Sequence, residues 1–178
     1  MASLTEAFEC FYQTNAQEII ENLFLGDVAT ADNERWLMDN NIVYILNVGA
    51  AFAKKHTTMQ VNGINVMFVE ITDDPSANIG KFFNACHDFI DQSLSKSQNI
   101  LVHCAAGVSR SATIVISYLM HKKGMSMEEA YAFVQKKRQF INPNKGFLNI
   151  LKQYDDYLFN SYKKNTLNGS LAEKMYKI

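Results

Sequence analysis

Residues 100–120 constrain the fold more than any other part of the chain. They begin with a short apolar run, Ile100-Leu101-Val102, which is typical of a buried strand. A loop of small residues follows, and after it a segment that is apolar almost all round predicts a buried helix opened by Ser111. A strand, a tight loop and a helix start place backbone N–H groups around a cavity, and such an arrangement binds anions. We therefore expect an anion-binding loop between the strand and the helix.

Composition favours one domain in a reducing compartment. The chain has 178 residues, 48% of them hydrophobic, which is enough for one domain with a sizeable core. A net charge of −1 gives no indication of a nucleic-acid partner, and no apolar run reaches the roughly 18 residues of a membrane span. The three cysteines show no paired spacing, and the N-terminus lacks a signal pattern. We expect a monomer of the cytoplasm or the nucleus.

Strand-like and helix-like segments alternate along the chain, which predicts an α/β fold. The expected strands are a hairpin within 18–25 and the segments 42–48, 65–71 and 100–102. The expected helices, several of them opened by a capping residue, cover 33–40, 79–94, 111–124, 126–139 and 146–162. We predict a central, mostly parallel sheet of about four to five strands with helices on both faces. An N-terminal helical extension (1–17) precedes the main domain (18–162), and a polar tail (163–178) with little to bury follows it.

The loop carries a cysteine at its entrance and an arginine at its exit. Cys104 in such a setting can attack a bound phosphate as a thiolate, because a helix N-terminus, N–H donors and a guanidinium all favour the anion. Arg110 offers a planar fork that grips two phosphate oxygens. The remaining phosphate contacts are expected from the backbone of the small residues between them, Ala105, Ala106, Gly107, Val108 and Ser109. This chemistry needs no metal and no cofactor.

Other polar residues near the loop have candidate roles in the same chemistry. His103 either holds the loop through its ring nitrogens or tunes the cysteine. The Ser111 hydroxyl is placed to donate to the sulfur and so to help it leave. The leaving oxygen needs a proton, and Asp73 and Asp74 both lie on the loop after the 65–71 strand. Either can supply that proton, because the residues alone leave the choice open.

The chain resembles the small dual-specificity phosphatases of the cysteine-dependent protein tyrosine phosphatase superfamily. The segments that carry the resemblance, within residues 18 to 160, are Asn22–Asp27, Ile45–Val48, His103–Ser111, Tyr118–Met120 and Asn142–Phe147. The resemblance implies the cysteine-dependent phosphatase fold, with Cys104 as nucleophile, Arg110 as phosphate clamp and Ser111 assisting departure of the thiolate. The family acid lies five residues before the Asn or Asp that opens the next helical segment; here Asn78 selects Asp73.

The resemblance also implies the activity: hydrolysis of phosphotyrosine, phosphoserine and phosphothreonine in proteins through a cysteinyl-phosphate. One alternative is a non-protein substrate such as a phosphoinositide, a phosphoglucan or an RNA 5′ end, although the neutral loop disfavours lipid. Another is a phospho-binding pseudophosphatase.

Ile150-Leu151 stands where the family often has Gln-Leu, and this difference alters helix packing. Cys86 is either a core residue or a redox partner of Cys104.

Overall fold

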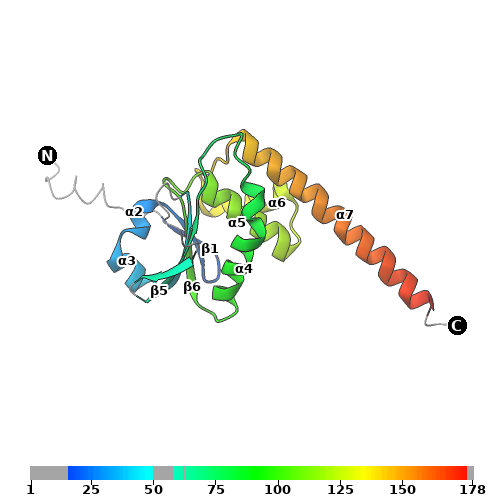
Figure 1. Ribbon diagram of the computed structural model, residues 1–178, viewed down its shortest axis with the longest axis horizontal. Coiled ribbons are helices and arrows are strands. Elements are labelled where there is room, and N and C mark those ends of the chain that lie inside the picture. Colours follow the sequence, from blue (N-terminus) through cyan, green and yellow to red (C-terminus); the bar gives the residue numbers. More distant parts are fainter. Residues whose placement is uncertain (1–15, 50–57, 62, 176–178) are drawn as a thin grey trace.

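A sheet of six strands forms the centre of the protein in a computed structural model that describes residues 16–49, 58–61 and 63–175 (Figure 1). The strands are β1 (Gln17–Ile20), β2 (Leu23–Gly26), β3 (Ile42–Val48), β4 (Thr58–Val61), β5 (Ile64–Val69) and β6 (Asn99–His103). They lie in the order β1-β2-β6-β3-β5-β4. The four inner strands are parallel, and each outer strand is antiparallel to its neighbour.

This sheet confirms the predicted α/β class and its mostly parallel sheet. The hairpin expected within 18–25 is β1 and β2, which meet at Asn22, a residue with φ of +66°. β4 is the strand that the sequence did not predict. It is a four-residue edge strand, and its pairing with β5 rather than any pattern of its own defines it.

Helices cover both faces of the sheet (Figure 1). One face is covered by α2 (Val28–Ala31) and α3 (Glu34–Asp39), which follow β2. The opposite face is covered by the short 3-10 helix η1 (Ile79–Phe82), α4 (Phe83–Leu94), α5 (Arg110–Lys123), α6 (Met127–Lys137) and the beginning of α7 (Lys145–Met175). Within the described residues, no helix is both long and apolar enough to cross a membrane.

Side-chain caps begin several of these helices where the sequence predicted. Asn33 Oδ1 accepts from the Trp36 N–H at the start of α3, and Ser126 and Glu129 form the expected reciprocal capping box of α6. Asn144 Oδ1 likewise accepts from the Phe147 N–H in the first turn of α7. α2 was not predicted, and the Asp27 side chain caps it. A capping residue thus indicates a helix start even where the helix is too short to show periodicity.

The predicted segments at the two ends of the chain are the N-terminal extension and the C-terminal tail, and the structure describes most of the tail but little of the extension. Residues 1–15 of the predicted N-terminal extension lie outside the described residues, and Gln17 already belongs to β1. At the other end, α7 runs to Met175 and not to about residue 162 as predicted. The segment 163–175 is polar but contains no proline, so nothing in the backbone stops the helix there. The division into an extension, a catalytic domain and a tail stays a prediction.

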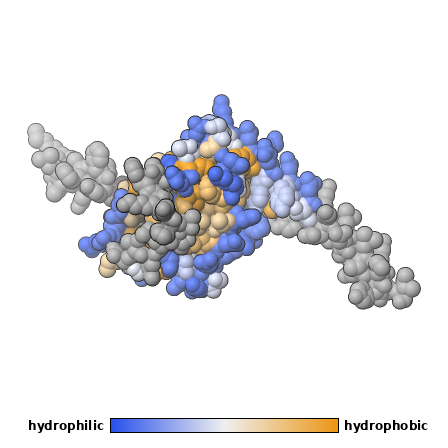
Figure 2. Space-filling view, viewed as in Figure 1, coloured by the Kyte–Doolittle hydropathy of each residue, from blue (hydrophilic) through white to orange (hydrophobic). Residues whose placement is uncertain are grey.

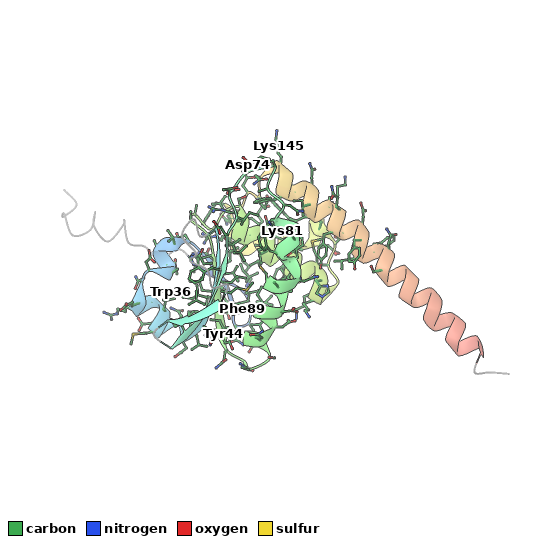
Figure 3. The ribbon with its side chains drawn as sticks, viewed as in Figure 1. Trp36, Tyr44, Asp74, Lys81, Phe89 and Lys145 are labelled. Atoms are coloured by element: carbon green, nitrogen blue, oxygen red, sulfur yellow. The ribbon has the colours of Figure 1, made fainter. Side chains whose placement is uncertain are left out.

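The core has one layer on each side of the sheet. On the α4 side, the rings of Tyr44 in β3 and Phe89 in α4 pack edge to face, with their centres 5.4 Å apart (Figure 3). On the other side, the ring centres of Phe24 and Trp36 are 5.9 Å apart. Every residue of Ser111–Met120 in α5 is buried, which confirms the helix predicted to be apolar all round. On the face seen in Figure 2, apolar residues gather in the middle and hydrophilic residues surround them.

The parallel strands bring three distant segments to one edge of the sheet. β3 ends at Val48, β5 at Val69 and β6 at His103, and all three run in the same direction. Gly49, Asp73 and Cys104 follow these strand ends, so they meet at the carboxyl edge, where open α/β sheets bind ligands.

Candidate active site

The loop between β6 and α5, residues 104–109, has its carbonyl groups bonded outward. Ala105 O accepts from the Val28 N–H at 3.2 Å, and Val108 O accepts from the Asn142 N–H at 2.9 Å. Arg138 donates to the two carbonyls between them, from Nη2 to Ala106 at 3.2 Å and from Nε to Gly107 at 2.8 Å. Because C=O and N–H point to opposite sides of a planar trans peptide, the N–H groups are turned to the inside of the loop. The loop is therefore an anion cradle, hereafter the phosphate loop.

Gly107 is the one position in this loop where only glycine fits. Its φ is +65°, and a Cβ there would overlap the Gly26 carbonyl and the Arg138 guanidinium. The loop thus packs directly on the end of β2 on one side and on a buried arginine on the other.

Cys104 lies at the base of the phosphate loop and is 3% exposed. Ser111 Oγ donates to its sulfur at 3.2 Å. Burial alone would raise the pKa of the Cys104 thiol, but hydrogen bonds from the Ser111 hydroxyl and from the N–H groups of Ser111 and Val108, together with the Arg110 charge, outweigh it. The net effect holds the pKa of Cys104 below its ordinary value, as a nucleophile requires.

His103 is buried and uncharged beside the cysteine. Burial lowers the pKa of its imidazole to about 4, against the opposing influence of its contact with the Cys104 carbonyl and of Asp32 and Asp27. Its Nδ1 lies 3.4 Å from the Cys104 carbonyl oxygen. Near neutral pH it therefore brings no positive charge to the thiolate. Of the two roles expected for His103, holding the loop is favoured over tuning the cysteine.

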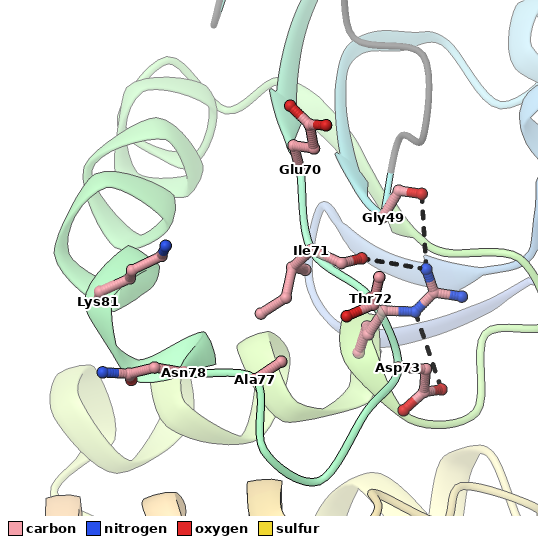
Figure 4. A pocket seen from close by; sticks show the side chains of 9 residues that line it. Gly49, Glu70, Ile71, Thr72, Asp73, Ala77, Asn78 and Lys81 are labelled. Atoms are coloured by element: carbon pink, nitrogen blue, oxygen red, sulfur yellow. Dashed lines mark hydrogen bonds and ion pairs between the residues drawn. The ribbon is translucent and has the colours of Figure 1, made fainter.

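Arg110 begins α5 and extends toward the ends of β3 and β5. Its Nη1 donates to the carbonyls of Gly49 at 3.5 Å and Ile71 at 3.4 Å, and its Nε lies 3.8 Å from Asp73 Oδ2 (Figure 4). Gly49, with φ of +126°, leaves space that a Cβ would take from the guanidinium. The Nε is buried and makes no hydrogen bond to any described residue, so it remains a donor for an oxyanion.

Asp73 and Asp74 are adjacent, but only Asp73 joins this group. Asp73 Oδ1 accepts from Ser109 Oγ at 2.7 Å and from Asn144 Nδ2 at 2.8 Å. Asp74 instead accepts from the hydroxyl and the N–H of Ser76, and these bonds lower the pKa of its exposed carboxyl. It lies at the margin of the molecule beside Lys145 (Figure 3). Asp74 is therefore a turn residue.

Sequence reasoning missed several residues that hold the site. Arg138 is 1% exposed, and the central carbon of its guanidinium lies 4.3 Å from the centre of the Phe140 ring. It donates hydrogen bonds to Gln17 Oε1 as well as to the phosphate loop. Asn144 was predicted as a helix cap but not as a partner of Asp73. Gly49, discussed above, was not singled out. A signal for Arg138 existed, since the chain has only three arginines and this one stands shortly before Asn142-Pro143-Asn144.

Cys86 belongs to the core and not to the site. It is fully buried in α4, and burial raises the pKa of its thiol to about 12. It is therefore a poor nucleophile, which favours the core interpretation over redox partnership with Cys104. Among the described residues, no group of three His, Cys, Asp or Glu side chains could hold a metal ion.

Comparison with known proteins agrees with this geometry. Residues 23–157 match the family described as dual specificity phosphatase, catalytic domain. The chain is 37% identical over 138 residues to dual specificity protein phosphatase 1B of Arabidopsis thaliana, covering 78% of this chain and 80% of that one. It is 38% identical over 145 residues to the human serine/threonine/tyrosine-interacting protein, covering 78% and 64%.

Solved structures give the same result. The crystal structure of the human tyrosine phosphatase-like serine/threonine/tyrosine-interacting protein superposes with a TM-score of 0.72 and 36% identity, covering 81% of this chain and 97% of that one. The chain belongs to the dual specificity phosphatase family, in the cysteine-dependent protein tyrosine phosphatase superfamily. It is a protein phosphatase, a hydrolase of phosphotyrosine, phosphoserine and phosphothreonine, and its relatives do not favour the non-protein substrates considered above.

Proposed function

We propose that Cys104, Arg110 and Asp73 carry out the hydrolysis in two steps. In the first, the Cys104 thiolate attacks phosphorus, a P–S bond forms, and the bond from phosphorus to the substrate oxygen breaks. Asp73 gives its proton to that leaving oxygen. Arg110 and the inward N–H groups of residues 105–109 bind the equatorial oxygens, where negative charge is spread in the transition state.

In the second step, water hydrolyses the cysteinyl-phosphate. The Asp73 carboxylate takes a proton from the water as its oxygen bonds to phosphorus, and the P–S bond breaks. The sulfur leaves as a thiolate, which the Ser111 hydroxyl stabilises by its hydrogen bond. Inorganic phosphate is released, and Asp73 is again protonated for the next cycle.

One observation carries this proposal: a buried cysteine with a lowered pKa lies in a loop whose carbonyls bond outward from Ala105 to Val108, beside a guanidinium with an unused donor. The Asp73–Arg110 contact fits the same scheme. A bound phosphate dianion competes with Asp73 for Arg110, and its oxygens supply the acceptor that Arg110 Nε lacks. The carboxyl group is then free to face the leaving-group oxygen.

The proposal is tested by turnover of p-nitrophenyl phosphate and a phosphotyrosine peptide by purified protein. We expect Cys104→Ser to reduce kcat by about 10⁴-fold or more, because the alkoxide needed for attack does not form at neutral pH. Vanadate should inhibit the wild-type protein. Turnover that survives in Cys104→Ser would exclude the mechanism. A wild-type protein that binds phosphopeptide without turnover would instead identify a phospho-binding pseudophosphatase.

We also propose that the protein acts in signalling, as a monomer on phosphoproteins of the cytoplasm or the nucleus. The odd number of cysteines without paired spacing supports a reducing compartment. Imaging of the tagged full chain tests its location, and its mass in solution by light scattering tests the monomeric state. Secretion of the protein or a stable dimer would contradict them.

A further inference from the structure

A cavity of about 650 Å³ lies next to Arg110, the residue that follows the phosphate loop (Figure 4). Arg110 and Asp73 line one end, Ile71 and Ala77 give it an apolar wall, and Lys81 of η1 lies across from them. Arg110, the proposed phosphate clamp, lines this cavity, so the cavity adjoins the phosphate site. Its volume lies within the roughly 300–1,000 Å³ of ordinary ligand sites. We call it the flanking cavity, because a group beside the phosphorylated residue would enter it.

Lys81 brings an unpaired positive charge to the flanking cavity. Its side chain is exposed, and its ammonium lies 4.8 Å from the centre of the Phe82 ring. Within the parts of the chain that the structure describes, no carboxylate lies within ion-pair distance of it. In Figure 4 Lys81 stands on one side of the cavity and Asp73 on the other, with Ile71 between them. An anionic side chain there would gain a partner without displacing one.

The other charges around the cavity restrict where such an anion can bind. Arg110 contacts Asp73 and is the proposed partner of the phosphate, and Asp73 is the proposed acid, so neither residue offers a partner for a flanking anion. Glu70 lies on the wall formed by the end of β5 and repels an anion placed on that side (Figure 4). Attraction at Lys81 and repulsion at Glu70 together direct an anionic group to the η1 wall.

We propose that the flanking cavity receives the side chain next to the phosphorylated residue, and that Lys81 selects an anionic group there. That group is a carboxylate or a second phosphate, which share the chemistry that an ammonium recognises. The preferred substrates are therefore phosphoproteins with an acidic or phosphorylated residue beside the one that is hydrolysed. This inference rests on the proposed function, because the phosphate held by Arg110 sets the position of the flanking side chain.

The test is a set of phosphotyrosine peptides in which glutamate, glutamine or phosphoserine occupies each of the two positions on either side of the phosphotyrosine. The readout is the ratio of kcat/KM between the Glu and Gln peptides for the same protein, so that general losses cancel. We expect a ratio of about two to five at one position for the wild type, as for an exposed ion pair. It should fall toward one as salt rises from about 50 to 500 mM, because screening weakens such pairs.

Variants of Lys81 should change this ratio in a graded way. Lys81→Gln should bring it to about one, and Lys81→Glu should bring it below one. Lys136→Glu is the matched control, because Lys136 is an exposed lysine of α6 that lines another cavity together with Lys123, the last residue of α5. The 14 residues of α5 separate that end from Arg110 by about 20 Å. The control should leave the wild-type ratio unchanged.

The phosphoserine arm distinguishes the two sources of the anion. A preference for phosphoserine over glutamate that Lys81→Gln removes assigns the cavity to a second phosphate, and the reverse order assigns it to a carboxylate. A wild-type ratio near one at every position, or one that persists in both Lys81 variants, overturns the inference. Cys104-dependent turnover of p-nitrophenyl phosphate would then still stand, so failure here is separable from failure of the proposed function.

Discussion

The phosphate loop and the loop that carries Asp73 meet at the same site but are held in different ways. The phosphate loop lies between a strand buried along Ile100–His103 and a helix buried along Ser111–Met120, and its carbonyls are bonded outward on both sides. Asp73 lies in the loop after β5, in a run of exposed residues, with its side chain 37% accessible. The proposed nucleophile is therefore preorganised, whereas the proposed acid is held by polar contacts that substrate can replace.

The partners of each loop support this contrast. Behind the phosphate loop stands Arg138, which is itself 1% exposed and has its guanidinium engaged on several sides. Asp73 contacts Ser109, Asn144 and Arg110, and Arg110 is the residue that we propose to bind phosphate. Rigid support favours charge stabilisation in the transition state, and exchangeable support suits a group that must meet substrates of different size.

Among the predictions that bear on this contrast, the largest effect separates the two neighbouring aspartates of the acid loop. Asp73→Asn should lower kcat on a phosphotyrosine peptide by about 10²–10⁴-fold, because the leaving oxygen loses its proton donor. The loss should be much smaller on p-nitrophenyl phosphate, whose leaving group needs little protonation. Asp74→Asn is the matched control and should stay within about twofold of wild type. If Asp74→Asn shows the large loss instead, the assignment of the acid is wrong.

The support behind the phosphate loop is tested next. Arg138→Met leaves the Ala106 and Gly107 carbonyls buried without a donor, so the free energy of unfolding should fall by about 2–4 kcal/mol. Turnover measured well below the unfolding transition should fall by about 10–100-fold, because the N–H groups lose their fixed direction. Denaturant titration and kcat measure the two effects. Arg35→Met, at an arginine whose side chain is 91% accessible, should change neither. Lost stability with unchanged kcat would reduce Arg138 to a purely structural residue.

The thiolate predicts a pH dependence that Ser111 controls. The rate of Cys104 alkylation by iodoacetamide should reach its midpoint below pH 9.0. Ser111→Ala should move that midpoint upward, because burial raises the pKa of Cys104 and the hydrogen bond from the Ser111 hydroxyl is the largest influence that lowers it. The pKa of Cys104 is lower in the folded protein than in the unfolded chain. Its thiolate therefore stabilises the folded protein fully above pH 9.0, and this stabilisation is lost as the pH falls through the pKa of the folded state. Cys86, whose pKa is raised to about 12, should stay unreactive and is an internal control. An unchanged midpoint in Ser111→Ala would contradict this role.

The smallest expected effect concerns how Asp73 is held. Asn144 both caps α7 and donates to Asp73, so Asn144→Ala removes two contacts. Asn144→Ser keeps a capping oxygen but does not reach the carboxylate, and it isolates the second contact. We expect Asn144→Ser to lower kcat on the phosphotyrosine peptide by about two- to tenfold, as for one hydrogen bond, with little change in thermal stability. Equal activity in wild type and both variants would show that Asp73 is positioned without Asn144.

Local patterns predicted the parts of the protein whose cause is local. The strand, the phosphate loop and the helix lie within residues 99–123, so the apolar pattern and the small residues of the loop sufficed to predict them. The capping box at Ser126 and the helix stop at Gly124 are confirmed for the same reason. β4 escaped because an edge strand is defined by its neighbour, and the end of α7 was placed too early because polar composition was taken as the end of a helix.

By itself, the order of residues determined that a cysteine and an arginine stand at the two ends of an anion-binding loop, since both belong to one strand-loop-helix unit. The residues alone left Asp73 and Asp74 open, and the family resemblance selected Asp73. The contacts that hold Asp73 are visible only in the tertiary structure, because Asp73 and Ser109 are 36 positions apart and meet only when parallel strands align their ends. The tertiary structure also revealed that Arg138 supports the loop, because its hydrogen bonds to the Ala106 and Gly107 carbonyls are formed only in the folded chain. Contacts across such separations depend on packing, and packing is a property of the whole folded chain.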